Sequence, residues 1–179
     1  MEDATIAALL TIASNFPKEF NAIIEIPKGS FNKYEIDKET GLIALDRANY
    51  SFAPYPFDYG FAPQTLWEDG DPLDILVMCS ESIQPLCLVH ATVIGNMQMI
   101  DNGQVDDKII AVAAKDPSVN HISRMEDLPQ HFLLELRNFF EQYKVLENKV
   151  VAIDNFQDQL IAYRIINEAI SLYKETYTK

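Results

Sequence analysis

Basic residues and cysteines are scarce in this sequence. It has 14 lysines and arginines against 27 aspartates and glutamates, which gives a formal net charge of -13. Basic surfaces are what binds nucleic-acid phosphates and anionic lipids without sequence specificity. This chain has few lysines and arginines from which to form such a surface. We therefore expect no nucleic-acid partner and no membrane partner. An anionic ligand would need a local group of cations or bound metal ions.

Long apolar runs are also missing. No run reaches the roughly 18 residues that suggest a membrane span, and the opening residues Met1 to Ala4 carry no basic stretch of the secretory type. The two cysteines, Cys79 and Cys87, lie in apolar surroundings without CxxC spacing. This pattern predicts two reduced, buried thiols and a cytoplasmic location.

Several catalytic motifs are absent. The sequence contains no GxxxxGK[ST] loop, no GxSxG elbow and no HExxH motif, and its histidines His90, His121 and His131 do not cluster. P-loop nucleotide hydrolases, serine hydrolases of the elbow type and zincins are therefore disfavoured.

The hydrophobic pattern predicts a mainly β chain with flanking helices. Between about 21 and 99, short β-branched or apolar runs alternate with Pro, Gly and Asn, which is typical of consecutive strands in a barrel or sandwich. Helical spacing appears at about 3–13, from Leu128–Pro129 onward, and at about 156–173 behind a possible cap at Asp154 or Asn155. We expect an α+β fold, mainly β: an OB-like β-barrel with helices packed outside it, in one domain over residues 1–179.

A β-hairpin is predicted where the runs 33–37 and 42–46 flank Lys38-Glu39-Thr40-Gly41. Period-two alternation puts Lys33 and Glu35 on one face of the first strand. Arg47 follows Ile43 and Leu45 at the same parity, which predicts a guanidinium at the rim of a core-facing strand. There it would bind phosphate or pair with Asp46 or Glu39, and the spacing leaves both readings open. Further strands are expected at 75–78, 88–94 and 109–113.

The stretch Glu68-Asp69-Gly70-Asp71-Pro72-Leu73-Asp74 holds three aspartates directly before an apolar strand. In an extended segment Asp69 and Asp71 would project to the same side. Two carboxylates about 4 Å apart repel by roughly 4 kcal/mol at an effective dielectric near 20, so converging carboxylates predict a bound cation. Oxygen ligands favour a hard ion such as Mg²⁺, Mn²⁺ or Ca²⁺. An EF-hand starting at Asp69 fails, because Asp74 would occupy the Gly position and Ser80 the bidentate Glu position.

A second acidic group, Asp101-Asn102-Gly103-Gln104-Val105-Asp106-Asp107-Lys108, lies in a predicted loop that also runs into a strand. Taken alone, each group is equally compatible with an ordinary surface turn. Glu25 lies in the apolar run Ile23-Ile24-Glu25-Ile26, where it either faces solvent or is buried beside a metal or a lysine. Tyr55-Pro56-Phe57-Asp58-Tyr59-Gly60-Phe61 is mostly a packing segment whose phenols could donate hydrogen bonds to phosphate.

Taken together, these motifs resemble the soluble family I inorganic pyrophosphatases, in the compact form typical of prokaryotes. The resemblance covers nearly the whole chain and includes IEIPKGSFNKYEIDKETG, LDR, YPFDYG, DGDPLDILV, DNGQVDDK and FFEQYK. It implies hydrolysis of inorganic pyrophosphate to two phosphates, a Mg²⁺ cofactor for which Mn²⁺ could substitute, an OB-like barrel and a homo-oligomer, hexameric in the prokaryotic type.

The resemblance also assigns roles to individual residues. Asp71 is the candidate general base, and Glu35 and Tyr59 are supporting active-site groups. The implied metal ligands are Asp69, Asp71, Asp74, Asp101 and Asp106, with Glu25 anchoring metal through water. The implied phosphate contacts are Lys33, Arg47, Tyr55, Lys108, Tyr143 and Lys144. The main departure from relatives lies at Val150 to Asn155, where many of them carry tryptophan.

Two other functions compete with this interpretation. An OB-like barrel could bind single-stranded nucleic acid without catalysis, for which the aromatic residues are present and the basic groove is missing. A metal-dependent hydrolase of nucleotides or longer polyphosphates would need a larger pocket and base recognition, for which the sequence gives no signal.

Overall fold

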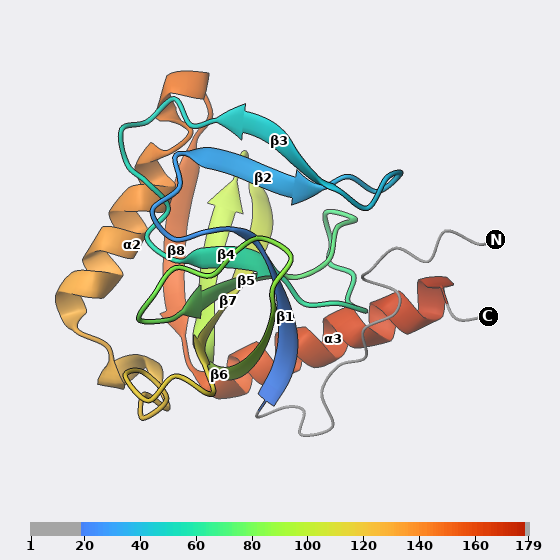
Figure 1. Cartoon of the computed structure of the whole chain (residues 1–179), viewed down its shortest axis with the longest axis vertical. Helices are drawn as coiled ribbons and strands as arrows, with labels where there is room; N and C mark the ends of the chain where they lie inside the picture. The colour runs from blue at the N-terminus through green and yellow to red at the C-terminus, as the bar shows by residue number, and fades with distance from the viewer. Residues whose placement is uncertain (1–18, 178–179) are drawn as a thin grey trace.

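The computed structural model describes residues 19–177, and the helix predicted at 3–13 lies outside them (Figure 1). The described chain contains eight strands and two long helices, and it also has two short 3-10 turns, Met125–Asp127 and Val145–Glu147. In chain order the strands and helices are β1 Glu19–Ile26, β2 Asn32–Ile36, β3 Ile43–Ala48, β4 Asp58–Phe61, β5 Asp74–Met78, β6 Leu88–Asp101, β7 Gln104–Ala113, α2 Gln130–Gln142, β8 Val151–Gln157 and α3 Gln159–Tyr177.

The main sheet closes on itself. Its strand order is β1-β4-β5-β7-β6-β8, and β1 pairs with β6 as well as with β4, so that five strands form a ring. All neighbours are antiparallel except β5 and β7, which run parallel. The helices lie outside this ring, α2 along one side and α3 across one end (Figure 1). This confirms the predicted fold class, a mainly β barrel with outer helices.

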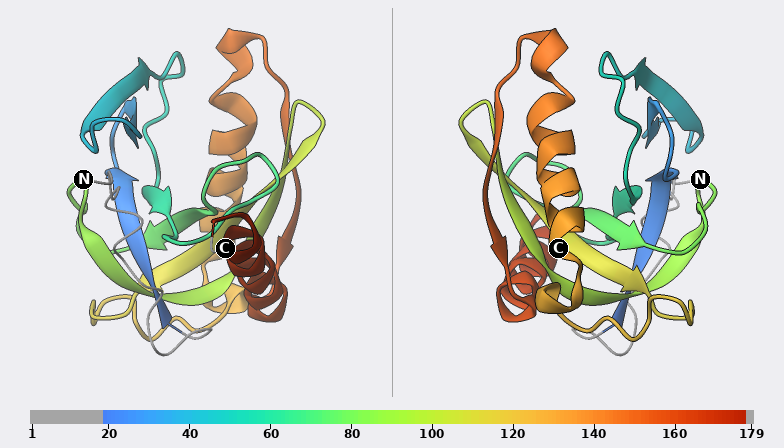
Figure 2. Two further views of the ribbon diagram at one scale, coloured as in Figure 1. Left: turned by 90° about the vertical axis from the view of Figure 1, so that its right-hand side faces the viewer. Right: turned by 90° about the vertical axis from the view of Figure 1, so that its left-hand side faces the viewer.

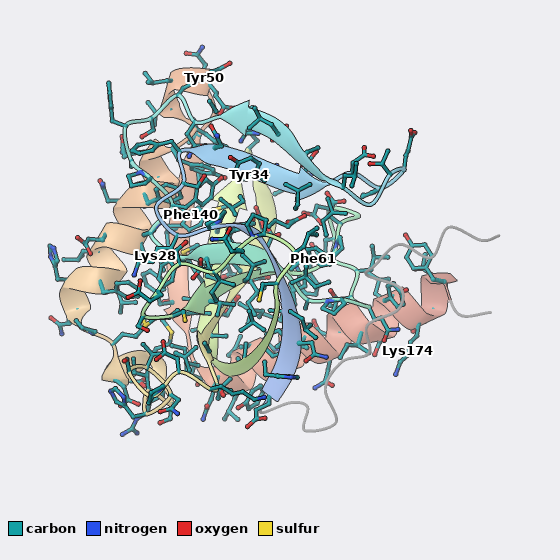
Figure 3. All side chains as sticks on the ribbon, in the orientation of Figure 1. Lys28, Tyr34, Tyr50, Phe61, Phe140 and Lys174 are labelled. Atoms are coloured by element: carbon teal, nitrogen blue, oxygen red, sulfur yellow. The ribbon has the colours of Figure 1, made fainter. Side chains whose placement is uncertain are left out.

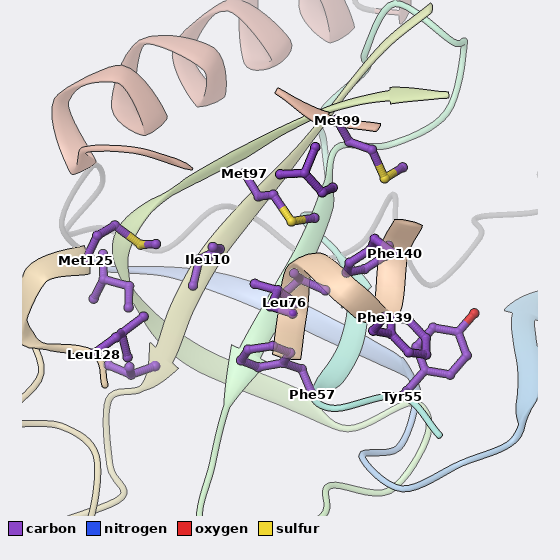
Figure 4. Packing of buried hydrophobic residues seen from close by; sticks show 14 of the residues in the cluster. Tyr55, Phe57, Leu76, Met97, Met99, Ile110, Met125, Leu128, Phe139 and Phe140 are labelled. Atoms are coloured by element: carbon purple, nitrogen blue, oxygen red, sulfur yellow. The ribbon is translucent and has the colours of Figure 1, made fainter. Parts of the chain in front are cut away.

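Both faces of the central strands are buried. Ile75 and Val77 of β5 join a cluster that includes α3, whereas Leu76 between them joins a cluster that includes α2. Strands buried on both faces read as continuous apolar runs, as this one does. In the second cluster, Tyr55 packs against Phe139 of α2 with ring centroids 5.0 Å apart (Figure 4). The packing of α2 therefore places its C-terminal end beside the segment that precedes β4.

The β2–β3 hairpin forms a separate two-stranded sheet to one side of the barrel (Figure 2). The predicted pairing is confirmed, with Gly41 at φ +69° in the connecting turn. Tyr34 of β2 packs on the cluster that contains Phe140 of α2 (Figure 3). The expectation that β3 is core-facing is wrong, because Leu45 is 60% exposed. The alternation of apolar residues along β3 therefore does not mark a face packed on the core.

Strands β6 and β7 are longer than predicted. Their pairing continues to Asp101 opposite Gln104, and only Asn102 and Gly103 form the turn, both with positive φ. An Asn-Gly pair suits such a two-residue hairpin turn because both residues tolerate that backbone conformation. The second acidic group is thus mostly strand, which fixes the side to which each of its residues points.

The sequence-based boundaries near the C-terminus need correction. Val151–Gln157 is strand β8, paired with β6, and α3 begins at Gln159 instead of about 156. Val151 and Ile153 are buried while Ala152 between them is exposed, a period-two pattern that favours a strand. The cap is Asp158, whose carboxylate accepts a hydrogen bond from the N–H of Ile161 at 3.0 Å; neither Asp154 nor Asn155 has this role.

Two smaller expectations concern the thiols and the membrane. Cys79 and Cys87 are both free, but Cys79 is only partly buried and Cys87 is exposed. Burial was predicted from apolar neighbours, yet Leu86 and Leu88 are themselves 40% exposed. Among the helices of residues 19–177, none combines the length and apolar character that a membrane crossing requires.

Candidate active site

The parallel pair β5–β7 joins the two acidic motifs. Asp74 at the start of β5 lies directly opposite Lys108 of β7. The Lys108 side chain is only 2% exposed, and its Nζ lies 2.6 Å from Asp74 Oδ2 and 2.9 Å from Asp106 Oδ1. Alternation along β7 puts Asp106 and Lys108 on this face and turns Asp107 to the other, where it accepts a hydrogen bond from Asn96 at 2.6 Å. Two acidic motifs that are separate in sequence therefore share one buried ammonium group.

Tyr59 completes this buried network. Its hydroxyl donates to Asp74 Oδ2 at 2.5 Å and accepts from Lys108 Nζ at 3.1 Å. Burial raises the pKa of Tyr59 well above its usual value, so the phenol stays protonated. The next residue, Gly60, packs so closely on β1 that a Cβ there would lie 1.9 Å from the carbonyl oxygen of Ile23. Only glycine fits at this point of YPFDYG, and that close approach sets the position of Tyr59.

The loop before β5 carries the other two aspartates of DGDPLD. Gly70 has φ +86°, and the N–H of Asp71 donates to Asp69 Oδ1 at 3.1 Å. The pKa of Asp69 is raised by burial and by the negative charges of Asp74 and Asp71. Asp71 is more exposed, and it accepts a hydrogen bond from Lys38 of the hairpin turn at 2.7 Å. This loop therefore contacts the barrel network on one side and the hairpin on the other.

Asp101 at the end of β6 pairs with Lys144, just after α2. The Oδ1 atom of Asp101 is buried without a hydrogen-bond partner among residues 19–177. The Lys144 ammonium group also lies 5.1 Å from the ring centroid of Tyr143, whose own pKa is raised by burial. Lys144 is therefore not ordinary helix-end charge, because it joins the end of α2 to Asp101 of the second acidic motif.

Glu25 lies at the end of β1, between barrel and hairpin. Its Oε1 accepts a hydrogen bond from the N–H of Ile36 at 2.8 Å. Burial raises the pKa of Glu25 to about 7, and the negative charge of Asp74 acts in the same direction. Lys33 opposes the shift. The sequence left open whether Glu25 faces solvent or is buried beside a metal or a lysine. In the structure it is partly buried, and Lys33 is among its charged neighbours.

The hairpin contributes a second, more exposed network. Lys33 Nζ lies 3.0 Å from Asp46 Oδ2 and 3.3 Å from Glu35 Oε2. Arg47 donates through Nη1 to Asp46 at 2.7 Å and through Nε to Glu147 Oε1 at 3.1 Å. The pairing of Arg47 with Asp46 was one of the two sequence-based alternatives, and no contact with Glu39 is found among the described residues.

Tyr55 and Tyr143 connect the two networks. Burial raises the pKa of Tyr55, while the positive charges of Arg47 and Lys108 oppose that shift. Lys108 has the same opposing effect on Tyr143. The two phenols therefore lie within electrostatic range of cations from both the hairpin and the barrel. The structure thus brings all the residues singled out from the sequence to one region, although they span positions 25 to 144.

Three contacts in this region were not predicted. Lys38 pairs with Asp71, Lys33 pairs with Asp46, and Glu147 holds Arg47. The pair of Asp46 with Arg47, by contrast, was one of the predicted alternatives. Glu147 gave no local signal, because it lies 100 residues from Arg47 along the chain.

Comparison with known proteins agrees with this arrangement. The family model described as inorganic pyrophosphatase matches residues 22–174. The chain belongs to the soluble family I inorganic pyrophosphatases. Among curated members of the family, the chain is 51% identical over 166 residues to the soluble inorganic pyrophosphatase PPA1 of Solanum tuberosum, covering 93% of this chain and 79% of that protein.

Solved structures of bacterial inorganic pyrophosphatases have the same fold. The enzyme of Thermus thermophilus matches with a TM-score of 0.89 and 39% identity, covering 92% of this chain and 97% of that one. The enzyme of Helicobacter pylori matches with a TM-score of 0.88 and 37% identity, covering 93% and 99%. The chain is thus more similar in sequence to the plant relative, and it spans nearly the full length of the bacterial ones.

Family I pyrophosphatases are metal-dependent, and the carboxylates of this chain suit a hard divalent cation. Burial and the negative charge of Asp74 both raise the pKa of Asp69 and of Asp106, and a bound cation would relieve the repulsion between these carboxylates. The unpartnered Oδ1 of Asp101 is a further available oxygen. Within residues 19–177, no three His, Cys, Asp or Glu side chains stand in a metal-ligand arrangement, and Lys108 and Lys144 are paired with these carboxylates. The oxygen donors of these carboxylates are of the kind that a hard divalent cation prefers.

Proposed function

We propose that these residues form the catalytic site for the hydrolysis of inorganic pyrophosphate to two phosphates, which is the reaction of this family and of this chain. One observation carries the assignment of the site. The motifs DGDPLD and DNGQVDDK meet across the parallel strands β5 and β7 around the buried ammonium group of Lys108.

The cations and phenols of the site bind the substrate. Pyrophosphate is small and densely charged, so it needs several donors at once. Lysine and arginine side chains stabilise the charge that develops on the leaving phosphate, and the protonated phenols donate hydrogen bonds to its oxygens. The proposed phosphate contacts are Lys33, Arg47, Tyr55, Lys108, Tyr143 and Lys144.

The acidic side chains bind the metal, and one of them accepts the proton of the attacking water. When bound, Mg²⁺ neutralises part of the charge of pyrophosphate and lowers the pKa of coordinated water. Asp71 is the proposed general base, since it is accessible and its partner Lys38 is an exposed lysine. Tyr59 and Glu35 support the site by orienting neighbouring charged groups. The proposed ligands are Asp69, Asp71, Asp74, Asp101 and Asp106, with Glu25 acting through water, and Mn²⁺ is a candidate substitute.

We also propose that residues 1–179 form one pyrophosphatase domain, that the protein is cytoplasmic and that it forms a homo-oligomer, a hexamer by resemblance to the prokaryotic members. The free thiols and the word "soluble" in the names of the curated relatives support the location. Size-exclusion chromatography with light scattering measures the oligomeric state directly.

One assay tests the proposed function. Phosphate release is measured from pyrophosphate, ATP and tripolyphosphate, each with Mg²⁺, with Ca²⁺ and with chelator. We expect strong preference for pyrophosphate with Mg²⁺ and loss of activity with chelator. Equal rates on ATP or tripolyphosphate would contradict the substrate assignment, and chelator-resistant activity would contradict the metal assignment.

A further inference from the structure

We infer that Glu147 is a positioning residue, which together with Asp46 fixes the guanidinium of Arg47 in the orientation that a phosphate group of the substrate requires. This inference rests on the proposed role of Arg47 in binding pyrophosphate. Glu147 belongs to neither acidic motif and lies after α2, in the short turn Val145–Glu147.

The contacts of Arg47 carry the first step. A guanidinium has five N–H donors in a rigid plane. Two atoms of that plane are held, Nε by Glu147 Oε1 at 3.1 Å and Nη1 by Asp46 Oδ2 at 2.7 Å. Among residues 19–177, no acceptor is found for Nη2. The two carboxylates thus fix the plane and leave the N–H groups of Nη2 available for a ligand.

The position of Glu147 carries the second step. Its side chain is only 11% exposed, and its Oε2 atom forms an ion pair with Lys149, 3.3 Å from Nζ. A largely buried carboxylate with a charged partner on each oxygen has few alternative positions. The turn ends at Asn148, which adopts the left-handed conformation with φ 58°. Glu147 is therefore a firm support for Arg47.

The topology shows why such a support is needed. The β2–β3 hairpin is a sheet of two strands, separate from the barrel, and a two-stranded hairpin is marginally stable by itself. The turn that carries Glu147 follows Lys144, which pairs with Asp101 at the end of β6. One short segment thus contacts the barrel through Lys144 and the hairpin through Glu147. It sets the position of Arg47 relative to the barrel residues, and less reorganisation is then needed when substrate binds.

The first experiment measures kcat and KM for pyrophosphate at saturating Mg²⁺ in Glu147→Ala and Glu147→Gln. Because a hydrogen bond to a charged group contributes about 1.5–3 kcal/mol, we expect the KM of Glu147→Ala to rise roughly ten-fold or more, with a smaller change in kcat. Glutamine retains an acceptor oxygen, so Glu147→Gln should recover part of the KM. Lys149→Gln is the matched control, since it removes the other partner of Glu147 and leaves the contact with Arg47. Because Lys149 is 45% exposed and exposed ion pairs contribute little, the KM of this variant should rise far less than that of Glu147→Ala. An unchanged KM in Glu147→Ala, or an equal rise in Lys149→Gln, overturns the inference.

A double-mutant cycle separates this inference from the proposed function. Arg47→Lys keeps the charge and loses the planar fork, and it should raise the KM. In that background Glu147→Ala should have little further effect, because the group that it positions is gone. If the effects of Arg47→Lys and Glu147→Ala on KM are additive, the positioning role of Glu147 is overturned, whereas the phosphate role of Arg47 stands. A normal KM in Arg47→Lys rejects the phosphate role of Arg47, and the inference fails with it.

Discussion

The site has a barrel half, made by Tyr59, Asp74, Asp106 and Lys108, and a hairpin half, made by Lys33, Glu35, Asp46 and Arg47. The two halves differ in how they hold their charges. The Lys108 side chain is 2% exposed, whereas those of Lys33 and Arg47 are 29% and 24% exposed. Strand pairing within one closed sheet fixes the barrel half, whereas the hairpin is a separate sheet that ion pairs of Lys38 and Arg47 join to other elements.

This difference has an energetic consequence. A buried charge that loses its partner is strongly destabilising, whereas an exposed ion pair contributes little. Substitutions in the barrel half should therefore affect both stability and turnover. Substitutions in the hairpin half should affect substrate binding with little effect on folding. The following predictions test that division, beginning with the largest effect.

Lys108→Gln should have the largest effect. It leaves Asp74 and Asp106 facing each other without a cation, and we expect the metal-free protein to lose about 3–5 kcal/mol of unfolding free energy. Turnover should fall by orders of magnitude, because a phosphate ligand is also removed. Denaturant unfolding with and without Mg²⁺ checks this, and the metal should restore part of the stability by binding the freed carboxylates. Unchanged metal-free stability would show that the buried network contributes nothing net to folding.

Asp71→Asn should separate catalysis from folding. Because the Asp71 side chain is 60% exposed, the substitution should change the unfolding free energy of the protein by less than about 0.5 kcal/mol. Loss of the general base should lower turnover by about 100-fold or more. The measurement is kcat at saturating Mg²⁺ alongside thermal unfolding, with Glu39→Gln on the exposed hairpin turn as the control. Near-normal turnover would reject the role given to Asp71.

The roles of the barrel half could be predicted from the sequence, but its geometry only in part. The aspartates of DGDPLD directly precede an apolar strand, as predicted, whereas 104–108 was expected to be a loop and forms the start of β7, where alternation places Asp106 and Lys108 on one face. The family motifs then supply their roles. The period-two pattern along a strand shows on which face of the strand each side chain lies. The parallel pairing of β5 with β7, which brings these side chains together, was not predicted.

The hairpin half could be predicted only in part, because its decisive contacts join distant elements. The predicted pairing of 33–37 with 42–46 is confirmed. The prediction that Leu45 faces the core is wrong. The contact of Arg47 with Glu147 depends on where α2 ends relative to the hairpin, and no periodicity encodes that relation. Strand β8 was not predicted for a similar reason. It pairs with residues 96–101 of β6, which lie beyond the strand predicted at 88–94.

Glu25 tests the boundary between the two halves, since it lies on β1 and accepts the N–H of Ile36. Its pKa is about 7 in the folded protein and 4.5 when unperturbed, so between these values the folded state binds the proton more tightly. Its contribution to stability is therefore present below pH 4.5 and lost as the pH rises through 7. In metal-free protein, this loss between pH 4.5 and 7 should be up to about 3 kcal/mol larger in wild type than in Glu25→Gln. Parallel stability curves for the two proteins would place Glu25 with the exposed half.

Lys38→Ala should have the smallest effect, and it probes the contact between the hairpin and the DGDPLD loop. Lys38 is 75% exposed and its partner Asp71 is 60% exposed, so the pair should contribute less than about 1 kcal/mol to unfolding free energy. The effect should shrink further in high salt, because exposed charges are screened. Turnover should stay near normal, since Lys38 is not among the proposed substrate contacts or metal ligands. Denaturant unfolding at low and high salt, with Lys38→Arg as the charge-preserving control, measures this. A loss as large as that of Lys108→Gln would mean that the hairpin half is held as firmly as the barrel half, and the division between them would fail.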